Sequence, residues 1–255
     1  MIFLSSIEPV YYLLPLIGFM VGLLGSMMGG GGGFIFLPTL TLIVGVPAQI
    51  AVITSLVATL PICIVGAISH YKMANIHFRM AILFAATGLV GALSGVAIAE
   101  LLSSDQLKTI FGIYSILMAL IITFTIRPQH NDYKSGFDRL KAPFFGLFAG
   151  VATGALSISG TAPILAGLFS LRLSVKTAIG TSMVIILSNT LFAAGAHFVV
   201  GQIDLTLVLF LTAGSIIGAV IGPRLLDGIK KKHSERFKYI HATVMAILGI
   251  LMIFK

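Results

Sequence analysis

Long apolar segments dominate this chain and restrict its fold more than any other feature. Most of them reach the roughly 20 residues that a helix needs to cross a bilayer. Only 9% of the 255 residues are charged, whereas about a quarter are charged in a soluble domain. The chain is therefore predicted to be an all-α integral membrane protein. The segments cover residues 10–28, 48–69, 78–99, 107–126, 175–200, 205–226 and 239–254.

Two shorter apolar segments, 34–44 and 162–171, follow stretches rich in Gly or Ser, and each contains a proline. At 1.5 Å per residue they cover only about half of the hydrocarbon thickness. We interpret them as half-helices. Each forms the second arm of a broken helical hairpin, over residues 10–44 in the first case and 142–171 in the second.

The two hairpins belong to an internal repeat with an offset of about 127 residues. The first repeat covers 1–126, the second covers 142–255, and a charged linker, 127–141, joins them. Each repeat has a broken hairpin and three transmembrane helices. A hairpin returns the chain to the side where it entered, so the three further helices give each repeat an odd number of net crossings. The second repeat is therefore predicted to lie upside down relative to the first, which makes two inverted repeats. Matched pairs are Gly18/Gly146, Gly22/Gly150, Pro38/Pro163, Ala51/Ala178, Thr54/Thr181, Ser55/Ser182, His70/His197, Gly91/Gly218 and Gly95/Gly222.

The distribution of positive charge agrees with this inversion. If the linker is cytoplasmic, fourteen of the sixteen Lys and Arg lie inside, and only Lys108 and Lys255 lie outside. The loop from Lys72 to Arg79 is basic, whereas its counterpart at 200–205 has no Lys or Arg. The protein is thus expected in the cell membrane with its N-terminus outside. The net charge of +8 then reflects anchoring in the bilayer, and nucleic acid is not expected as a partner.

The candidate site lies at the two breaks, 29–33 and 157–161. Five glycines form poor helix, and non-helical backbone at membrane depth is tolerated only where it is buried in protein or lines a cavity. The alternative is that the glycines only let two helices pack closely. Half-helix N-termini offer N–H donors and partial positive charge, which suits an anion. We expect Ser159 or Thr161 to cap the second half-helix, and Pro163 suits its first turn.

Hydroxyl side chains in the long helix after each hairpin extend this candidate site. They are Thr54 and Ser55 in the first repeat and Thr181 and Ser182 in the second. The alternative is that they only bond to the backbone of their own helix. Asn189 is the costliest of these side chains to leave unpaired. His70 and His197 are candidates for proton coupling, with hydrogen-bonded interfacial histidines as the alternative. The predicted substrate-binding residues are Gly30, Gly31, Gly32, Gly33, Thr54, Ser55, Ser157, Ser159, Gly160, Thr161, Thr181, Ser182 and Asn189.

Several kinds of chemistry have no matching pattern in the sequence. The histidines show no metal-ligand spacing, no phosphate-binding loop for ATP occurs, and Cys63 is a single cysteine. The middle of every span lacks Asp, Glu, Lys and Arg, which disfavours cation pumping. No metal, cofactor or catalytic residue is therefore expected. Repeated small residues indicate close helix packing and also allow a homodimer.

Several segments together resemble the TauE/SafE family of sulfite exporters. They are GGGGGFIFLP at 29–38, AVITSL at 51–56, HYKMANIHFR at 70–79, AIGTSMVI at 178–185, GQIDLTL at 201–207 and GAVIGPRL at 218–225. The resemblance implies a permease that moves small sulfur-containing anions such as sulfite, sulfoacetate or other organosulfonates, usually outward. Two features depart from the family pattern. Residues 157–161 replace a second glycine-rich break, and His77 stands where an acidic residue is usual.

The sequence thus predicts a secondary transporter in the lipid bilayer that exports a small anion by alternating access. A passive anion channel is the alternative. An integral membrane enzyme is a weaker third hypothesis, because no acid, base and nucleophile come together within the spans.

Overall fold

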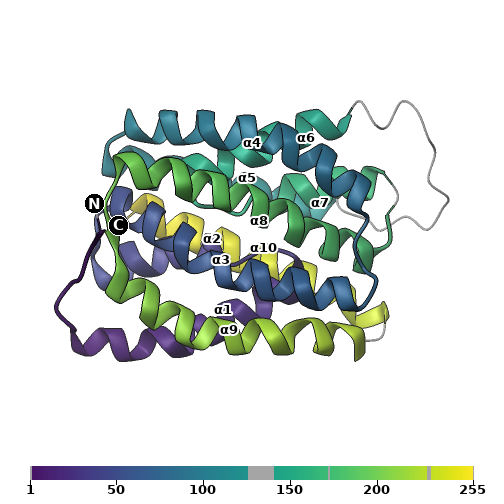
Figure 1. Ribbon diagram of the computed structural model, residues 1–255, viewed down its shortest axis with the longest axis horizontal. Coiled ribbons are helices and arrows are strands. Elements are labelled where there is room, and N and C mark those ends of the chain that lie inside the picture. Colours follow the sequence, from purple (N-terminus) through teal and green to yellow (C-terminus); the bar gives the residue numbers. More distant parts are fainter. Residues whose placement is uncertain (1, 126–140, 172, 229–230, 255) are drawn as a thin grey trace.

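The computed structural model describes residues 2–125, 141–171, 173–228 and 231–254 (Figure 1). Within these residues, six helices are long and apolar enough to cross a membrane, so the predicted all-α membrane fold is confirmed. The linker predicted at 127–141 lies outside the described residues except for Lys141. The helices are α1 (Leu14–Met28), α2 (Gly33–Pro38), α3 (Ala48–Lys72), α4 (Phe78–Glu100), α5 (Ser104–Thr125), α6 (Lys141–Leu156), α7 (Thr161–Ser170), α8 (Val175–Val200), α9 (Leu205–Gly228) and α10 (Lys231–Phe254).

The two half-helices occur where the sequence predicts them. The first is α2, which continues after Pro38 as a π-helical turn at Thr39–Val44, and the second is α7. Pro38 closes α2, whereas Pro163 lies in the first turn of α7. The predicted match between these two prolines is therefore wrong, because they occupy different positions in their half-helices.

Long helices pack in matched pairs around a central pair (Figure 1). Gly18 of α1 lies against the Leu211 carbonyl of α9, and Gly150 of α6 lies against the Gly88 carbonyl of α4. A β-carbon at any of these glycines would collide with the neighbouring backbone, so the small residues set the helix spacing. In the centre α3 packs on α8, while α5 and α10 pack on each other.

Corresponding loops lie at opposite ends of this bundle. The carbonyl of Asn75, just after α3, lies against Gly180 near the start of α8. Gly201, just after α8, lies against the Ile53 side chain near the start of α3. An inverted repeat requires this arrangement. The inversion across a membrane stays a prediction, which these matched contacts support.

His77 and Asp204 perform the same structural task in the two halves. The His77 Nδ1 atom accepts a hydrogen bond from the Met80 N–H at 3.4 Å, in the first turn of α4. The Asp204 carboxylate accepts from the Thr206 and Leu207 N–H groups at 3.0 and 3.4 Å, in the first turn of α9. Both side chains cap a helix N-terminus. The histidine can thus replace the acidic residue of the family pattern in this loop.

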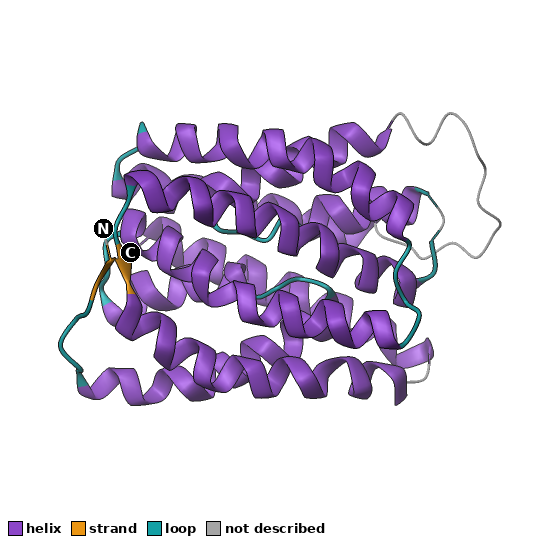
Figure 2. Ribbon diagram, in the orientation of Figure 1, coloured by secondary structure: helices purple, strands orange, loops and turns teal. Residues whose placement is uncertain are grey.

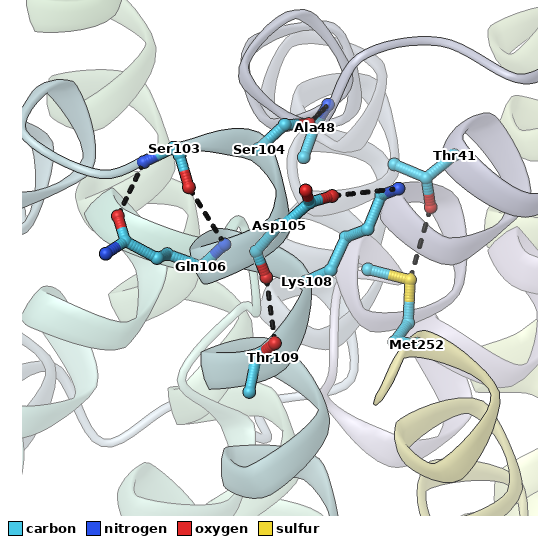
Figure 3. Close-up of polar contacts among 9 residues, drawn as sticks. All are labelled: Thr41, Ala48, Ser103, Ser104, Asp105, Gln106, Lys108, Thr109 and Met252. Atoms are coloured by element: carbon cyan, nitrogen blue, oxygen red, sulfur yellow. Dashed lines mark hydrogen bonds and ion pairs between the residues drawn. The ribbon is translucent and has the colours of Figure 1, made fainter. Parts of the chain in front are cut away.

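Figure 3 shows the end of the bundle where α5 begins. The Ser103 hydroxyl accepts from the Gln106 N–H at 3.3 Å, and the Gln106 side chain accepts from the Ser103 N–H at 2.8 Å. This reciprocal capping box begins the helix at Ser104, three residues before the predicted start. The Ser104 hydroxyl also accepts from the Ala48 N–H at 2.8 Å, so a hydrogen bond connects the first residues of α3 and α5.

The N-terminal segment also contributes structure that the sequence reasoning did not anticipate. Strand β1 (Ile2–Phe3) pairs in parallel with β2 (Ile203–Asp204), and a 3₁₀ helix at Pro9–Leu13 leads into α1. The Thr206 hydroxyl donates to the Ser5 carbonyl at 3.1 Å. The N-terminal segment is therefore held at the loop that follows α8.

Candidate functional site

The two breaks meet inside the bundle. Figure 2 draws short loops in the middle of the helices, away from the loops at the two ends. We call residues 29–33 the first tip and residues 157–161 the second tip. The Gly33 N–H of the first tip donates to the Ser159 hydroxyl of the second at 3.3 Å. The Thr161 hydroxyl donates to the Gly30 carbonyl at 3.3 Å, so the tips are in direct contact.

The tips have positive φ angles at two matched positions although their sequences differ, and only the first tip has a third, at Gly31 with φ of 63°. Gly29 and Ser157 both lie in the left-handed region, with φ of 68° and 54°, and Gly32 and Gly160 do so with φ of 100° and 56°. In each tip an N–H bonds to the carbonyl two residues earlier, from Gly32 in the first and from Gly160 in the second. Ser157 therefore adopts a conformation that a residue with a β-carbon disfavours.

Hydroxyls from the two central helices cross to the opposite tips. The Ser55 hydroxyl of α3 lies 2.8 Å from the Ser157 hydroxyl, and the Ser182 hydroxyl of α8 donates to the Gly29 carbonyl at 3.0 Å. Both serines are fully buried. The structure thus brings Ser55, Ser182, Ser157 and the first tip together, as the matched positions suggested.

Ser159 and Thr161 do not cap α7 as expected. The residue before α7 is Gly160, with no side-chain cap, and both hydroxyls bond to the first tip instead. Pro163 carries no N–H. Within the described part of the chain, the Thr161 and Ala162 N–H groups have no acceptor, although both residues are buried. These N–H groups at the start of a helix are suited to an anion.

Thr54 and Thr181 lie in matched positions outside the tips. The Thr54 hydroxyl accepts from the Asp204 N–H at 3.3 Å, and the Thr181 hydroxyl accepts from the His77 N–H at 2.9 Å. Each threonine therefore holds the loop that precedes a helix of the other half. The structure does not bring these two hydroxyls to the tips.

His70 and His197 join the central helices to the first arms of the hairpins. The His70 Nε2 atom lies 3.3 Å from the Ser26 carbonyl of α1, and the His197 Nε2 atom lies 2.8 Å from the Gly154 carbonyl of α6. The His197 Nδ1 atom also lies 3.5 Å from the Glu100 carboxylate. Both histidines are buried. Both make a hydrogen bond to a carbonyl, as expected from the alternative to proton coupling.

Three further side chains line the tips and were missed in the sequence analysis. Cys63 and Thr59 of α3 lie beside Gly31, and the His241 ring of α10 stacks on Phe34 with a centroid distance of 4.7 Å. Thr59 and Cys63 lie about one and two turns after Ser55, so helical spacing offered a means to find them. The sequence contains no comparable indication for His241. Among the described residues no three His, Cys, Asp or Glu come together as metal ligands.

The family model described as "Sulfite exporter TauE/SafE" matches residues 14–252. Two relatives named as probable membrane transporter proteins match along nearly the whole chain. The one from Methanocaldococcus jannaschii is 28% identical, with 94% of each chain covered. YdhB of Bacillus subtilis is 25% identical, with 95% of this chain and all of its own length covered. A third relative with the same description, from Xylella fastidiosa, is 29% identical over 93% of this chain. No solved structure matches.

Proposed function

The chain belongs to the TauE/SafE sulfite exporter family, and from this premise we propose that it exports small sulfur-containing anions by alternating access. It is a multi-pass membrane transporter. Sulfite and organosulfonates such as sulfoacetate are the proposed substrates. Transport rather than catalysis is the proposed activity, with no cofactor.

One observation carries the proposal: two buried tips meet inside the helix bundle and offer hydrogen-bond donors without a charged side chain. The N–H groups of Thr161 and Ala162 lack acceptors within the described residues, and the hydroxyls of Ser159 and Thr161 reach the other tip. A bilayer provides no water to satisfy such donors. An anion held there is stabilised by oriented N–H groups and the partial positive charge of the α7 N-terminus.

The matched contacts of the two halves support alternating access. Ser55 and Ser182 each join a central helix to the opposite tip, and His70 and His197 each join a central helix to a hairpin. Two halves with equivalent contacts can exchange conformations, which opens the tips first to one side and then to the other. His197 is the better candidate for proton coupling, because the Glu100 carboxylate lies beside it.

We place the protein in the cell membrane with its N-terminus outside and the segment 127–141 in the cytoplasm. The small anion and the lipid bilayer are its proposed partners, a homodimer is a further proposal, and nucleic acid has no role in the proposal. The basis is the distribution of Lys and Arg over the loops.

Flux of sulfite and of small sulfonates in proteoliposomes tests the proposal. Thr161→Val removes a tip hydroxyl at nearly constant volume, and Ser159→Ala removes the acceptor of the Gly33 N–H. Each variant should lower flux by about tenfold, since one lost hydrogen bond in the transport cycle corresponds to about 1.4 kcal/mol. Thr212→Val, which removes a buried hydroxyl that bonds only within α9, is the matched control.

Unchanged flux in both tip variants would remove these residues from the site. The same proteoliposomes separate a transporter from a passive anion channel. A transporter that alternates between two states is accelerated by substrate on the far side of the membrane. Flux that lacks this trans-stimulation and exceeds the rate of exchange would support the channel instead.

A further inference from the structure

We propose that Asn189 anchors the transported anion and selects anions that carry a hydrogen-bond donor, such as an O–H group, in addition to their acceptor oxygens. The inference rests on the proposed function, because it assumes that the second tip holds a small anion. It adds the location of the site, in the second half of the molecule, and the class of anion that fits it.

The amide of Asn189 is entirely unpaired. Both its Nδ2 and its Oδ1 atoms are buried without a hydrogen-bond partner among the described residues, and the side chain has no exposed surface. The hydroxyl of the next residue, Thr190, is also buried and unpaired. Other buried threonines of the bundle, such as Thr153 and Thr212, donate to a carbonyl of their own helix. Because an unpaired buried amide is strongly unfavourable, this one points to a ligand.

A chain of direct contacts places Asn189 near the second tip. Gly160 lies against Ala149 of α6, the next residue Gly150 lies against the Gly88 carbonyl of α4, and Gly88 lies against the Asn189 amide. A β-carbon at Gly88 would collide with the Asn189 side chain. The amide therefore occupies the space that the missing side chain of Gly88 leaves free.

Helix register gives the depth of Asn189 relative to α7. Helices α7 and α8 are joined by a short connection after Ser170, and Thr161 of α7 and Ser182 of α8 both bond to the first tip, so the two helices run in opposite directions. Asn189 is fourteen residues past the start of α8, and Thr161 is nine residues before the end of α7. At 1.5 Å per residue, Asn189 lies about 7.5 Å further along the helix axis than the α7 N-terminus. N–H groups in the first turn of a helix point beyond its N-terminus, so those of Thr161 and Ala162 are directed toward the level of Asn189.

The chemistry of the two groups defines the ligand. Backbone N–H groups only donate, so they require acceptor oxygens on the anion. The amide both donates, through Nδ2, and accepts, through Oδ1. An anion with acceptors alone leaves Oδ1 unpaired and facing a negatively charged oxygen. A site built to pair a donor rejects an analogue that lacks it, so a hydroxylated or singly protonated oxyanion is the preferred cargo.

The first half has no equivalent of this amide. At the repeat offset, Asn189 corresponds to Ile62, and Gly88 corresponds to Ser215. Ile62 is buried and lies beside Gly32 of the first tip. The anchor is therefore asymmetric.

Competitive flux of two sulfonates in proteoliposomes tests the inference. Ethanesulfonate and 2-hydroxyethanesulfonate have the same charge and differ by one O–H group. The wild-type protein should prefer the hydroxylated anion by at least tenfold in kcat/KM. Asn189→Leu and Asn189→Ala should bring this ratio close to one, whereas Thr212→Val, which removes a hydroxyl that bonds only within α9, should leave it unchanged. The thermal unfolding midpoint of Asn189→Leu should equal or exceed that of the wild type, because the variant loses no hydrogen bond.

The outcomes separate this inference from the proposed function. Flux of both sulfonates without a preference in the wild type, or a preference that survives both Asn189 variants, would overturn the role of Asn189 and leave anion transport intact. A lower unfolding midpoint for Asn189→Leu would show that the amide is paired, for instance through a structural water, and would also overturn it. Absence of flux of both anions in the wild type would instead refute the proposed transport of small sulfonates.

Discussion

Replacing Ser157 by glycine should give a more stable protein than replacing it by alanine, the reverse of the usual order. The φ of Ser157 is 54°, close to the 68° of Gly29 at the matched position. A residue with a β-carbon in this region costs about 1–2 kcal/mol, and glycine avoids that cost. Alanine keeps the β-carbon, so Ser157→Ala keeps the strain.

The size of the difference follows from the contacts of Ser157. Both variants lose the hydrogen bond to the Ser55 hydroxyl, 2.8 Å away, so this loss of about 1 kcal/mol cancels in the comparison. Ser55 keeps its bond to the Ala51 carbonyl at 2.6 Å and is not left unpaired. Glycine loses about 0.5–1 kcal/mol through the greater freedom of the unfolded chain. The net preference for glycine over alanine is then about 0.5–1 kcal/mol.

Thermal unfolding of the purified variants in detergent measures this difference. For a chain of this size 1 kcal/mol corresponds to about 2–4 °C, so the glycine variant should unfold about 1–4 °C above the alanine variant. Ser94, an exposed residue within α4, is the control. There the order should be normal, with glycine less stable than alanine by about 1 kcal/mol. An alanine variant at 157 that matches or exceeds the glycine variant would refute the strain argument.

Three further predictions concern the bundle and its movement. Thr54→Val and Thr181→Val each leave a loop N–H without its hydroxyl acceptor, so each should lower stability by about 1 kcal/mol; two unchanged unfolding midpoints would contradict this. The single cysteine, Cys63, is fully buried beside the first tip, so mass spectrometry should find slow maleimide labelling without substrate and faster labelling during transport. Rapid labelling without substrate would contradict the burial of Cys63. In a cysteine-free background, Asn75→Cys and Gln202→Cys should react with an impermeant reagent from opposite sides of the membrane, because their loops lie at opposite ends of the bundle; labelling from one side would rule out the inversion.

The sequence by itself determined the membrane-spanning elements and the positions of the two breaks. Apolar segments of sufficient length and a run of five glycines are local properties, and the bilayer leaves little choice of structure for either. Matched residues such as Ser55 and Ser182 also reached matched places, because both copies of the repeat place them on the same face of a helix. The family resemblance rested on the same residues, and the family match covers 14–252.

Only the tertiary structure decided how the polar groups are paired. Ser159 suited a helix cap by its position, yet its hydroxyl accepts from the Gly33 N–H, 126 residues away in the chain. Thr54 and Thr181 hold loops rather than line the tips, and Asn189 is left without a partner. The reason is physical: hydrophobic burial depends on area and follows from local composition, whereas a hydrogen bond requires a distance and a direction that exist only once distant segments have packed together.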